Sequence, residues 1–461
     1  MNFKKFFAKN KLLVLAFVFA LALQVFFLLT LPYPVVPDIF ERVRVTEYLL
    51  ENGSFPSFDP LIAPNGIYYL YPPLVDLFLA LGSIVFFSSP IIVWKILSFV
   101  FFAVFLFFCI KFSEKYLVKN QQALMVFFLA FAPVILRRFV SYVAETVGLG
   151  FFAILFFLIS KKKFWFAGLV LGVIGLIHFR TFFTTISILG FFALFSIARK
   201  NKEDFFGSLK TIFFGIVLCS PFYLVNFSKI IAISPFTNPF VGDNIFTALG
   251  FLGVPLLLFA LLSIPFLKKS KFDSLLVSLI VVPLLFLSGV LFSDKPFVFA
   301  YREGVFLVLP LAILAAFSFS KIWLLLKKHY LQTIAIIILF VLFSFFFVTP
   351  KSGFSSDDEK VINYLNANVP KGELVLSDYI FDYWLEYSGF SIVAGPFIER
   401  RPDAEQRLFL LNDFFEGKNS MVLQEFSPKC IVFRNREPKK DFTADFEEVF
   451  VSGKNSVYCR E

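Results

Sequence analysis

The sequence predicts a polytopic α-helical membrane protein with a C-terminal extracytoplasmic α/β domain. Hydrophobic residues make up 58% of the 461 residues and charged residues only 16%, and the mean hydropathy is +0.81. A soluble protein carries more charge, whereas apolar runs of about 20 residues are typical of membrane-spanning helices. Hydrophobicity drops sharply after Pro350, so we expect a transmembrane domain over 1–349 and a soluble domain over 350–461.

Eleven apolar runs predict eleven spans, which are 12–31, 91–110, 122–136, 142–160, 164–178, 181–198, 211–227, 245–267, 274–292, 304–320 and 331–349. The first run follows a lysine-rich stretch but lacks a small-x-small cleavage site. We therefore expect an uncleaved helix there, with a cleaved signal peptide as the alternative. A further apolar piece, 73–89, contains Asp76 and ends before Pro90. It is either another span or a re-entrant or surface-lying helix.

The distribution of lysine predicts the topology. If 73–89 does not cross the membrane, the basic N-terminus and all the lysine clusters face the cytoplasm, as the positive-inside rule requires. These clusters lie in 111–119, 161–163, 199–210, 268–271 and 321–328. We therefore expect about eleven spans plus one re-entrant or surface helix in the cell membrane, with a cytoplasmic N-terminus and an extracytoplasmic tail. Because the net charge of +10 belongs to such loops, we expect no nucleic-acid partner.

The tail alternates short apolar segments with amphipathic helices. A helix capped at Ser355 is expected to continue to about Ala367, and a second helix is expected over 402–416. Strands are expected at 373–377, 391–395, 430–433, 446–451 and 456–460. Cys430 and Cys459 can form a disulfide only if the tail lies outside the cytoplasm. No Cys-x-x-Cys pair is present, which argues against a zinc site.

The predicted topology gathers acidic and Arg residues on the outer side of the membrane, in the first outer loop (32–72) and at helix ends. Charged groups at the outer ends of several helices indicate a binding or catalytic site, although short outer loops also need polar residues for solvation. The candidate residues are Asp38, Arg44, Glu47, Tyr71, Arg137, Arg138, Glu145, His178, Arg180, Arg302 and Glu303.

The first outer loop resembles that of the catalytic subunit of oligosaccharyltransferase. In that family an Asp is followed at +6 by Arg and at +8 to +10 by Thr-Glu-Tyr. Here Asp38, Arg44 and Thr46-Glu47-Tyr48 fall at those offsets. The resemblance implies the GT-C superfamily of integral-membrane glycosyltransferases, whose fold is shared by oligosaccharyltransferase, protein mannosyltransferase and lipid-A aminoarabinose transferase.

A second segment, which begins at Pro133, resembles the second outer loop of the same family. The family carries Pro-x4-Arg-Ser-x5-Asp-Asn-Glu, and here Arg138 falls on its Arg and Glu145 on its Asp. Val147 falls on its Glu, so one expected metal ligand is absent. The resemblance implies that Asp38 and Glu145 are the two positions left for a divalent cation such as Mg²⁺ or Mn²⁺. No other cofactor is expected.

The resemblance also implies a reaction. An inverting glycosyltransferase would move a sugar from a polyprenyl-phosphate or polyprenyl-diphosphate donor to an extracytoplasmic glycan, lipid or protein acceptor. Asp38 would be the base that activates the acceptor, with Glu145 as a second carboxylate. Arg302 and Arg138, with Arg137 beside them, would bind the donor phosphate, because a guanidinium group suits phosphate geometry.

Each candidate also has a structural interpretation. Glu145 can be an acid favoured by the positive end of a helix, and Arg302 can extend its guanidinium to the lipid headgroups. His178 and Arg180 can belong to a hydrogen-bonded interfacial turn. Tyr71 can belong to the aromatic belt at the membrane surface.

Two motifs that hold the acceptor peptide in oligosaccharyltransferases are degraded. Where the family has Trp-Trp-Asp-Tyr-Gly, this chain reads 378–385, in which Tyr383-Trp384 fits but Ile380 replaces the Asp. The outer loop at 233–243 offers no Glu. We therefore do not expect glycosylation of Asn-x-Ser/Thr sequons. The alternatives are an oligosaccharyltransferase with divergent acceptor recognition, a transporter or flippase for lipid-linked sugars, and a non-catalytic relative.

Overall fold

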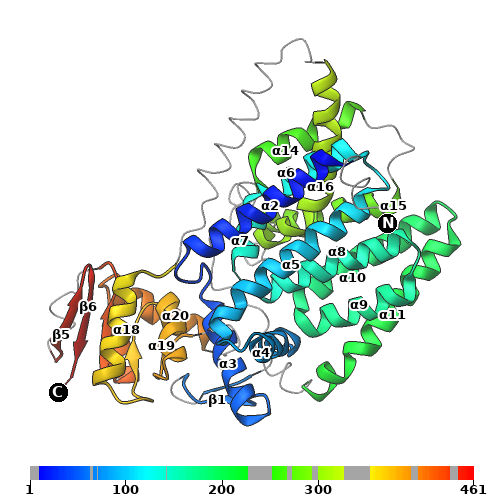
Figure 1. Cartoon of the computed structure of the whole chain (residues 1–461). Coiled ribbons are helices and arrows are strands. Elements are labelled where there is room, and N and C mark those ends of the chain that lie inside the picture. Colours follow the sequence, from blue (N-terminus) through cyan, green and yellow to red (C-terminus); the bar gives the residue numbers. More distant parts are fainter. Residues whose placement is uncertain are drawn as a thin grey trace. The chain divides into compact units, whose positions relative to one another are not determined.

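The computed structural model describes residues 10–62, 66–69, 71–141, 143–226, 252–266, 273–292, 300–325, 353–395, 403–436 and 445–460. The chain divides into two compact units (Figure 1). The helical unit contains 1–30, 95–224 and 240–350, and the mixed unit contains 31–94, 225–239 and 351–461. The predicted span over 331–349 lies outside the described residues.

The helical unit is built from long apolar helices. Its helices are α2 (Lys11–Thr30), α5 (Pro90–Ser113, from Lys95 onward), α6 (Lys119–Ala130), α7 (Pro133–Val140), α8 (Ala144–Ser160), α9 (Phe164–Ile177), α10 (Phe179–Ala198), α11 (Lys202–Val225), α14 (Val254–Leu261), α15 (Ser274–Phe292) and α16 (Ala300–Leu325), with a short 3-10 turn at Ile264–Phe266. Among the described residues, five helices are long and apolar enough to cross a membrane, which confirms a multi-pass membrane protein. The predicted total of eleven spans stays a prediction.

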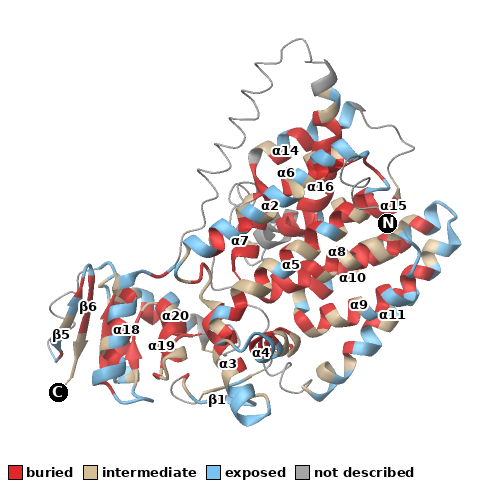
Figure 2. Cartoon of the chain, in the orientation of Figure 1, coloured by how far each residue is buried: buried red, intermediate tan, exposed pale blue. Residues whose placement is uncertain are grey.

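Burial separates the central helices of this unit from the peripheral ones (Figure 2). The apolar stretch of α16 is 72% buried, whereas that of α11 is only 22% buried. Exposed apolar side chains on α11, such as Phe213 and Val225, are what a lipid-facing helix presents. Burial therefore places Gly304–Ile322 of α16 inside the bundle and α11 at its edge.

Small residues let α9 and α11 approach closely. A Cβ at Gly168 would lie 2.7 Å from the Cβ of Phe214, and one at Gly172 would lie 2.6 Å from the Cβ of Leu218. Glycine at four-residue spacing is a common way to bring two membrane helices together. Two hydrogen bonds add to this close packing, because the Thr211 hydroxyl of α11 donates to the Phe164 carbonyl at 3.1 Å and the Tyr223 hydroxyl donates to the Gly175 carbonyl at 2.8 Å.

The predicted span over 122–136 is bent in the structure, which divides it into α6 and α7 at an angle of 65°, as in a broken span or a re-entrant segment. Pro133 is the cause. The residue before a proline avoids the helical region, and Ala132 is extended, with φ −67° and ψ 120°. Proline is then well suited to the first turn of α7. The bend gives α7 its own direction and places Arg137 and Arg138 in its last turn.

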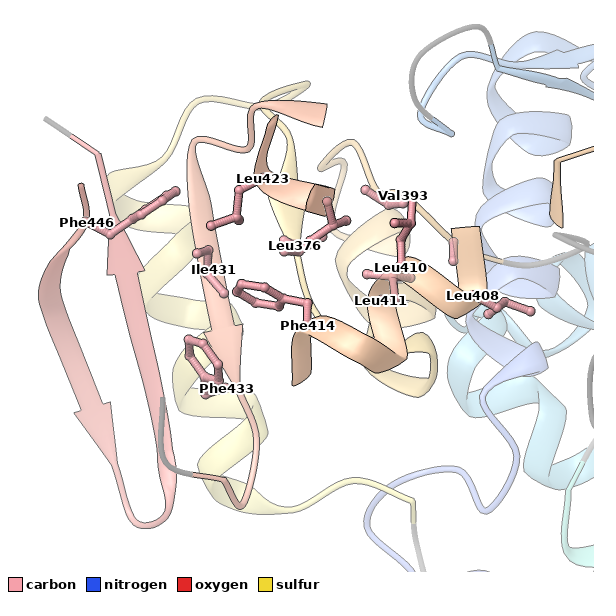
Figure 3. Close-up of a cluster of buried hydrophobic side chains, with 12 residues drawn as sticks. Leu376, Val393, Leu408, Leu410, Leu411, Phe414, Leu423, Ile431, Phe433 and Phe446 are labelled. Atoms are coloured by element: carbon pink, nitrogen blue, oxygen red, sulfur yellow. The ribbon is translucent and has the colours of Figure 1, made fainter. Parts of the chain in front are cut away.

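The mixed unit contains a four-stranded sheet in the order β3 (Val375–Leu376), β4 (Cys430–Phe433), β6 (Asn455–Cys459) and β5 (Glu447–Ser452). β3 and β4 are parallel, and the other two pairs are antiparallel. Helices α18 (Ser356–Asn368), α20 (Ala404–Phe415) and α21 (Met421–Phe426) accompany the sheet. Leu376, Ile431 and Phe433 of the strands pack with Leu411 and Phe414 of α20 in one hydrophobic core (Figure 3).

Most of the predicted tail elements are confirmed. The side chain of Ser355 accepts the backbone N–H of Asp358 and so caps α18 as expected. The predicted strand at 391–395 is wrong, since Ser391 and Ile392 form only isolated bridges. The sequence analysis also missed the short helix α19 (Tyr379–Tyr387). Asp378 starts that helix by accepting the N–H groups of Ile380 and Phe381.

The first outer loop folds together with the tail. It contains α3 (Asp38–Asn52) and the hairpin of β1 (Phe58–Asp59) and β2 (Ile67–Tyr68), and α4 (Leu74–Phe86) follows it in the same unit. Ile62 of the loop pairs with Ile392 of the tail, and the Ile392 N–H donates to the Leu61 carbonyl at 2.9 Å. The predicted domain boundary at residue 350 did not anticipate that 31–94 folds in one unit with the tail. α4 has 13 residues, a length of about 20 Å against about 30 Å of hydrocarbon, which suits the predicted re-entrant or surface-lying helix.

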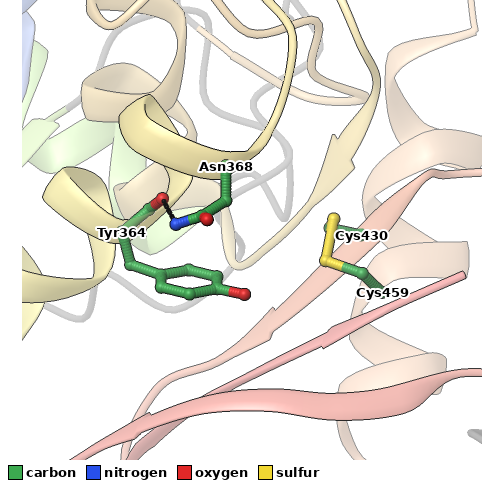
Figure 4. The surroundings of a disulfide bond; sticks show 4 residues. All are labelled: Tyr364, Asn368, Cys430 and Cys459. Atoms are coloured by element: carbon green, nitrogen blue, oxygen red, sulfur yellow. Dashed lines mark hydrogen bonds between the residues drawn. A yellow bond between two sulfur atoms is a disulfide. The ribbon is translucent and has the colours of Figure 1, made fainter. Parts of the chain in front are cut away.

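A disulfide joins Cys430 of β4 to Cys459 of β6 (Figure 4). The two residues are register partners on neighbouring antiparallel strands. The bridge closes a loop with a sequence separation of 29 residues, so that it ties the last strand to the centre of the sheet. A structural disulfide is typical of an oxidising compartment, which favours the extracytoplasmic tail.

Replacing both Cys430 and Cys459 with Ser should destabilise the mixed unit by about 3–4 kcal/mol, the loop-closure free energy for a bridge of this span. Thermal unfolding of the detergent-purified protein measures the loss. Cys219→Ala is the control, because Cys219 is a free buried thiol. A reductant should reproduce the loss in the wild type and change nothing in the double variant. Equal unfolding temperatures for wild type and double variant would contradict the prediction.

Candidate functional site

Asp38 is the first residue of α3, directly after Pro37 at the N-cap. It is half-buried, and its carboxylate forms no hydrogen bond or ion pair with any other described residue. The N-terminus of a helix is its positive end and stabilises a carboxylate there. Asp38 is thus held in place by the helix backbone while its carboxylate oxygens stay available.

Arg44 and Glu47 are candidate site residues on the same helix as Asp38, but they lie on other sides of α3. At 3.6 residues per turn, offsets of 6 and 9 residues correspond to rotations of about 240° and about 180°. Arg44 forms ion pairs with Asp59 and Glu386. Glu47 accepts the hydroxyl of Tyr387 at 3.4 Å. Arg44 therefore contacts both the hairpin and the tail of the same unit, and Glu47 contacts the tail.

Arg42 shares the side of α3 that carries Asp38, and it was not among the candidate site residues. Its guanidinium is 3% exposed and forms an ion pair with Asp76 at 3.1 Å. It donates to the Tyr69 hydroxyl at 2.6 Å and lies 3.7 Å from the ring centroid of Tyr71. Tyr71, a predicted site residue, thus covers a buried cation. The lone Asp76 in an apolar run was the available signal, because a buried acid needs a partner.

The bend between α7 and α8 brings two predicted residues together. Arg138 Nε lies 3.0 Å from Glu145 Oε2, with the side chains 15% and 4% exposed. The Thr146 hydroxyl donates to the Arg138 carbonyl at 2.6 Å and to the Ser141 carbonyl at 2.9 Å. These bonds fix the connection between the two helices. Glu145 therefore has a specific cationic partner in addition to its position in the first turn of α8.

The other predicted residues lie near helix ends. His178 separates α9 from α10, and its Nδ1 accepts the backbone N–H of Thr181 at 3.3 Å, which caps α10. This contact agrees with the structural interpretation of His178. Arg180 lies in the first turn of α10, and Arg137 is exposed on α7. Arg302 and Glu303 lie in the first turn of α16, with side chains outside the described set.

The segment that replaces the acceptor-binding motif has a packing role in the mixed unit. Asp382 is buried and accepts the Ser377 hydroxyl and the Ala394 N–H at 3.2 Å. Burial raises the pKa of the Asp382 carboxyl well above its usual range. The Trp384 ring stacks on Phe40 of α3, with ring centroids 5.1 Å apart. These side chains therefore hold α3 and the tail together.

Carboxylates of the described residues do not form a metal site. No group of three or more His, Cys, Asp or Glu side chains there could hold a metal ion. Glu145 is already paired with Arg138. The described part of the chain thus does not supply the ligand set that a divalent cation needs.

No protein-family model matches the sequence, and no curated protein matches it. Several solved structures do. The oligosaccharyltransferase of Archaeoglobus fulgidus in the apo form is 14% identical, with a TM-score of 0.65 over 94% of this chain and 70% of that chain. ArnT from Cupriavidus metallidurans in the apo state is 10% identical, with a TM-score of 0.65 over 98% of each chain. The arabinofuranosyltransferase AftD from mycobacteria is 12% identical, with a TM-score of 0.63 over 98% of this chain and 40% of that chain.

These likenesses confirm the predicted GT-C-like fold, which is a helical membrane region followed by a C-terminal region with a sheet. Three of the matching structures were solved with bound molecules. The archaeal enzyme has been solved with an inhibitory peptide and a dolichol-phosphate, and also with Zn and sulfate. ArnT has been solved with undecaprenyl phosphate.

Proposed function

We propose that this protein is an inverting glycosyltransferase. It moves a sugar from a polyprenyl-phosphate or polyprenyl-diphosphate donor to an extracytoplasmic glycan, lipid or protein acceptor. The observation that carries the proposal is the fold, since nearly the whole chain matches oligosaccharyltransferase and ArnT. The polyprenyl phosphates in complexes of both proteins support the class of donor.

The proposed base is Asp38. As the acceptor nucleophile attacks the anomeric carbon, its proton passes to a carboxylate oxygen of Asp38. The bond between the anomeric carbon and the phosphate oxygen breaks, and the polyprenyl phosphate leaves with the electron pair. Attack on the face opposite the leaving group inverts the anomeric centre. An aspartate whose oxygens are not engaged by described side chains suits this role.

The proposed phosphate ligands are Arg138, Arg137 and Arg302. Guanidinium groups neutralise the charge that grows on the leaving phosphate. Glu145 holds the Arg138 guanidinium through its ion pair at 3.0 Å, so it orients a cation for the donor. This role for Glu145 fits the structure better than a metal ligand does.

A requirement for Mg²⁺ or Mn²⁺ stays a prediction of the resemblance. The archaeal enzyme with Zn and sulfate supports a cation in that protein. No step above passes through a metal, because the described carboxylates do not gather into a ligand set. A bound cation would add Lewis-acid stabilisation of the leaving phosphate.

The proposed orientation places the N-terminus in the cytoplasm and the tail outside it. Lysine clusters in alternate loops support it, and so does the disulfide of the tail.

Purified protein in proteoliposomes, supplied with a labelled polyprenyl-linked sugar pool and crude acceptor membranes, tests the proposed function. We expect the label to leave the polyprenyl carrier and to appear on an acceptor, with the anomeric configuration opposite to that of the donor. A flippase would move the intact lipid-linked sugar across the bilayer without cleavage. Intact translocated donor and no transferred label would therefore contradict the proposal.

A further inference from the structure

Two carboxyl groups and one guanidinium group meet inside the mixed unit. Arg44 of α3 forms ion pairs with Asp59 of β1 and with Glu386 of α19. Their side chains are 23%, 8% and 1% exposed, respectively. Gly395 packs directly against Glu386. A Cβ atom added at Gly395 would lie 3.2 Å from Glu386 Oε2. The contact joins elements separated by more than 300 residues of sequence.

The charges of this group do not balance if both acids are ionised. One partly exposed guanidinium then faces two buried carboxylates, and an uncompensated buried charge is strongly unfavourable. Glu41, which is 3% exposed, adds a further negative field that acts on Glu386. The surplus charge disappears if one carboxyl holds a proton.

The geometry assigns that proton to Glu386. Asp59 accepts the Leu61 N–H at 3.0 Å in addition to its contacts with Arg44, so Asp59 is the better stabilised anion. Both carboxyl oxygens of Glu386 are buried, and neither accepts a hydrogen bond from a described residue, so Glu386 is the less well stabilised anion of the two. Burial is the main reason that the pKa of Glu386 lies well above its usual range, and Asp59 raises it further.

We propose that protonated Glu386 is a positioning residue that fixes α3 through Arg44 and Asp59, and that losing this proton in alkaline solution loosens α3 and slows glycosyl transfer. α3 carries Asp38 at its first residue. The part of the inference that concerns transfer rests on the proposed function. The part that concerns the proton rests only on the Arg44, Asp59 and Glu386 contacts.

The direction of the pH dependence follows from the position of the proton. The folded protein binds a proton on Glu386 that the unfolded chain releases near pH 4.3, the ordinary pKa of Glu in peptides. The contribution of this proton to the free energy of unfolding is therefore greatest below about pH 4.3. It falls as the pH rises from that value to the raised pKa of Glu386 in the folded state. The folding equilibrium constant changes by up to about tenfold per pH unit in that interval.

The test compares wild type with Glu386→Gln and Glu386→Ala between pH 5.5 and pH 9. Gln is the neutral isostere of the protonated acid and keeps contacts with Arg44 and Asp59. We expect the unfolding temperature of the wild type to fall with rising pH, while that of Glu386→Gln changes little. Glu373→Gln, which alters an exposed acid of the tail, should behave as wild type.

Transfer rates separate positioning from simple stability. We expect Glu386→Gln to keep kcat at pH 6 and to lose the alkaline decline of the wild type. Glu386→Ala should lose about tenfold in kcat with a donor KM within about twofold. If neither the wild type nor any variant transfers sugar, the proposed function fails. The proton assignment still stands in that case, provided that the unfolding temperature falls with pH in the wild type and not in Glu386→Gln. The same pH dependence in wild type and Glu386→Gln would overturn the inference.

Discussion

Replacing Asp38 with Asn should lower the transfer rate by about 10² to 10⁴-fold, the usual contribution of a general base. Asn keeps the shape of the side chain but cannot accept the proton of the acceptor. Because no described residue bonds to the Asp38 carboxylate, the fold should lose little. The variant should insert into membranes and unfold within a degree or two of the wild type.

The matched control for this experiment is Glu51→Gln. Glu51 lies on the same helix as Asp38 and is exposed near the other end. The same chemical change at that position should leave transfer unchanged. If Asp38→Asn retained full activity, Asp38 would not be the base, whatever the fold.

Replacing Arg138 with Ala should have the second-largest effect, because it acts on both stability and donor binding. The change removes the 3.0 Å ion-pair contact between Arg138 and Glu145, which is 4% exposed. Removing one member of a buried pair costs about 3–5 kcal/mol. It also removes a guanidinium that we assign to the donor phosphate, so the donor KM should rise.

A double variant separates these two effects. Arg138→Ala combined with Glu145→Ala removes both charges, so thermal stability should recover in large part. Activity should not recover, since the guanidinium is still missing. Arg137→Ala is the control for stability, because Arg137 is exposed in the same turn of α7. Recovery of transfer in the double variant would show that Arg138 serves only to neutralise Glu145.

The sequence predicts where the helices of this protein lie better than it predicts where an apolar run divides into two helices. Apolar runs identify α2, α5 and α10 because membrane helices must be apolar over a fixed length. The break at Pro133 was missed because the run 122–136 stays apolar across it. In the tail, the Ser355 cap predicted α18, and the short apolar segments 446–451 and 456–460 predicted β5 and β6.

The candidate site was predicted where its residues are near one another in sequence. Arg138 and Glu145 are seven residues apart, and the structure pairs them. The partners of Arg44 could not be predicted, since Glu386 reaches it only through the contact of α19 with α3. For the same reason, the aromatic segment around Trp384 was compared with an acceptor-binding motif, whereas the structure stacks it on Phe40.

The most direct test of the central claim is sugar transfer from a polyprenyl-linked pool by wild type and Asp38→Asn, each with and without a chelator. We predict transfer by the wild type and a loss of at least about 10²-fold in the variant. Chelator sensitivity in the wild type would add a cation to that account, and insensitivity would leave Asp38 as a metal-free base. Equal transfer by wild type and Asp38→Asn, or no transfer by the wild type, would contradict the claim that this protein is a glycosyltransferase with Asp38 as its base.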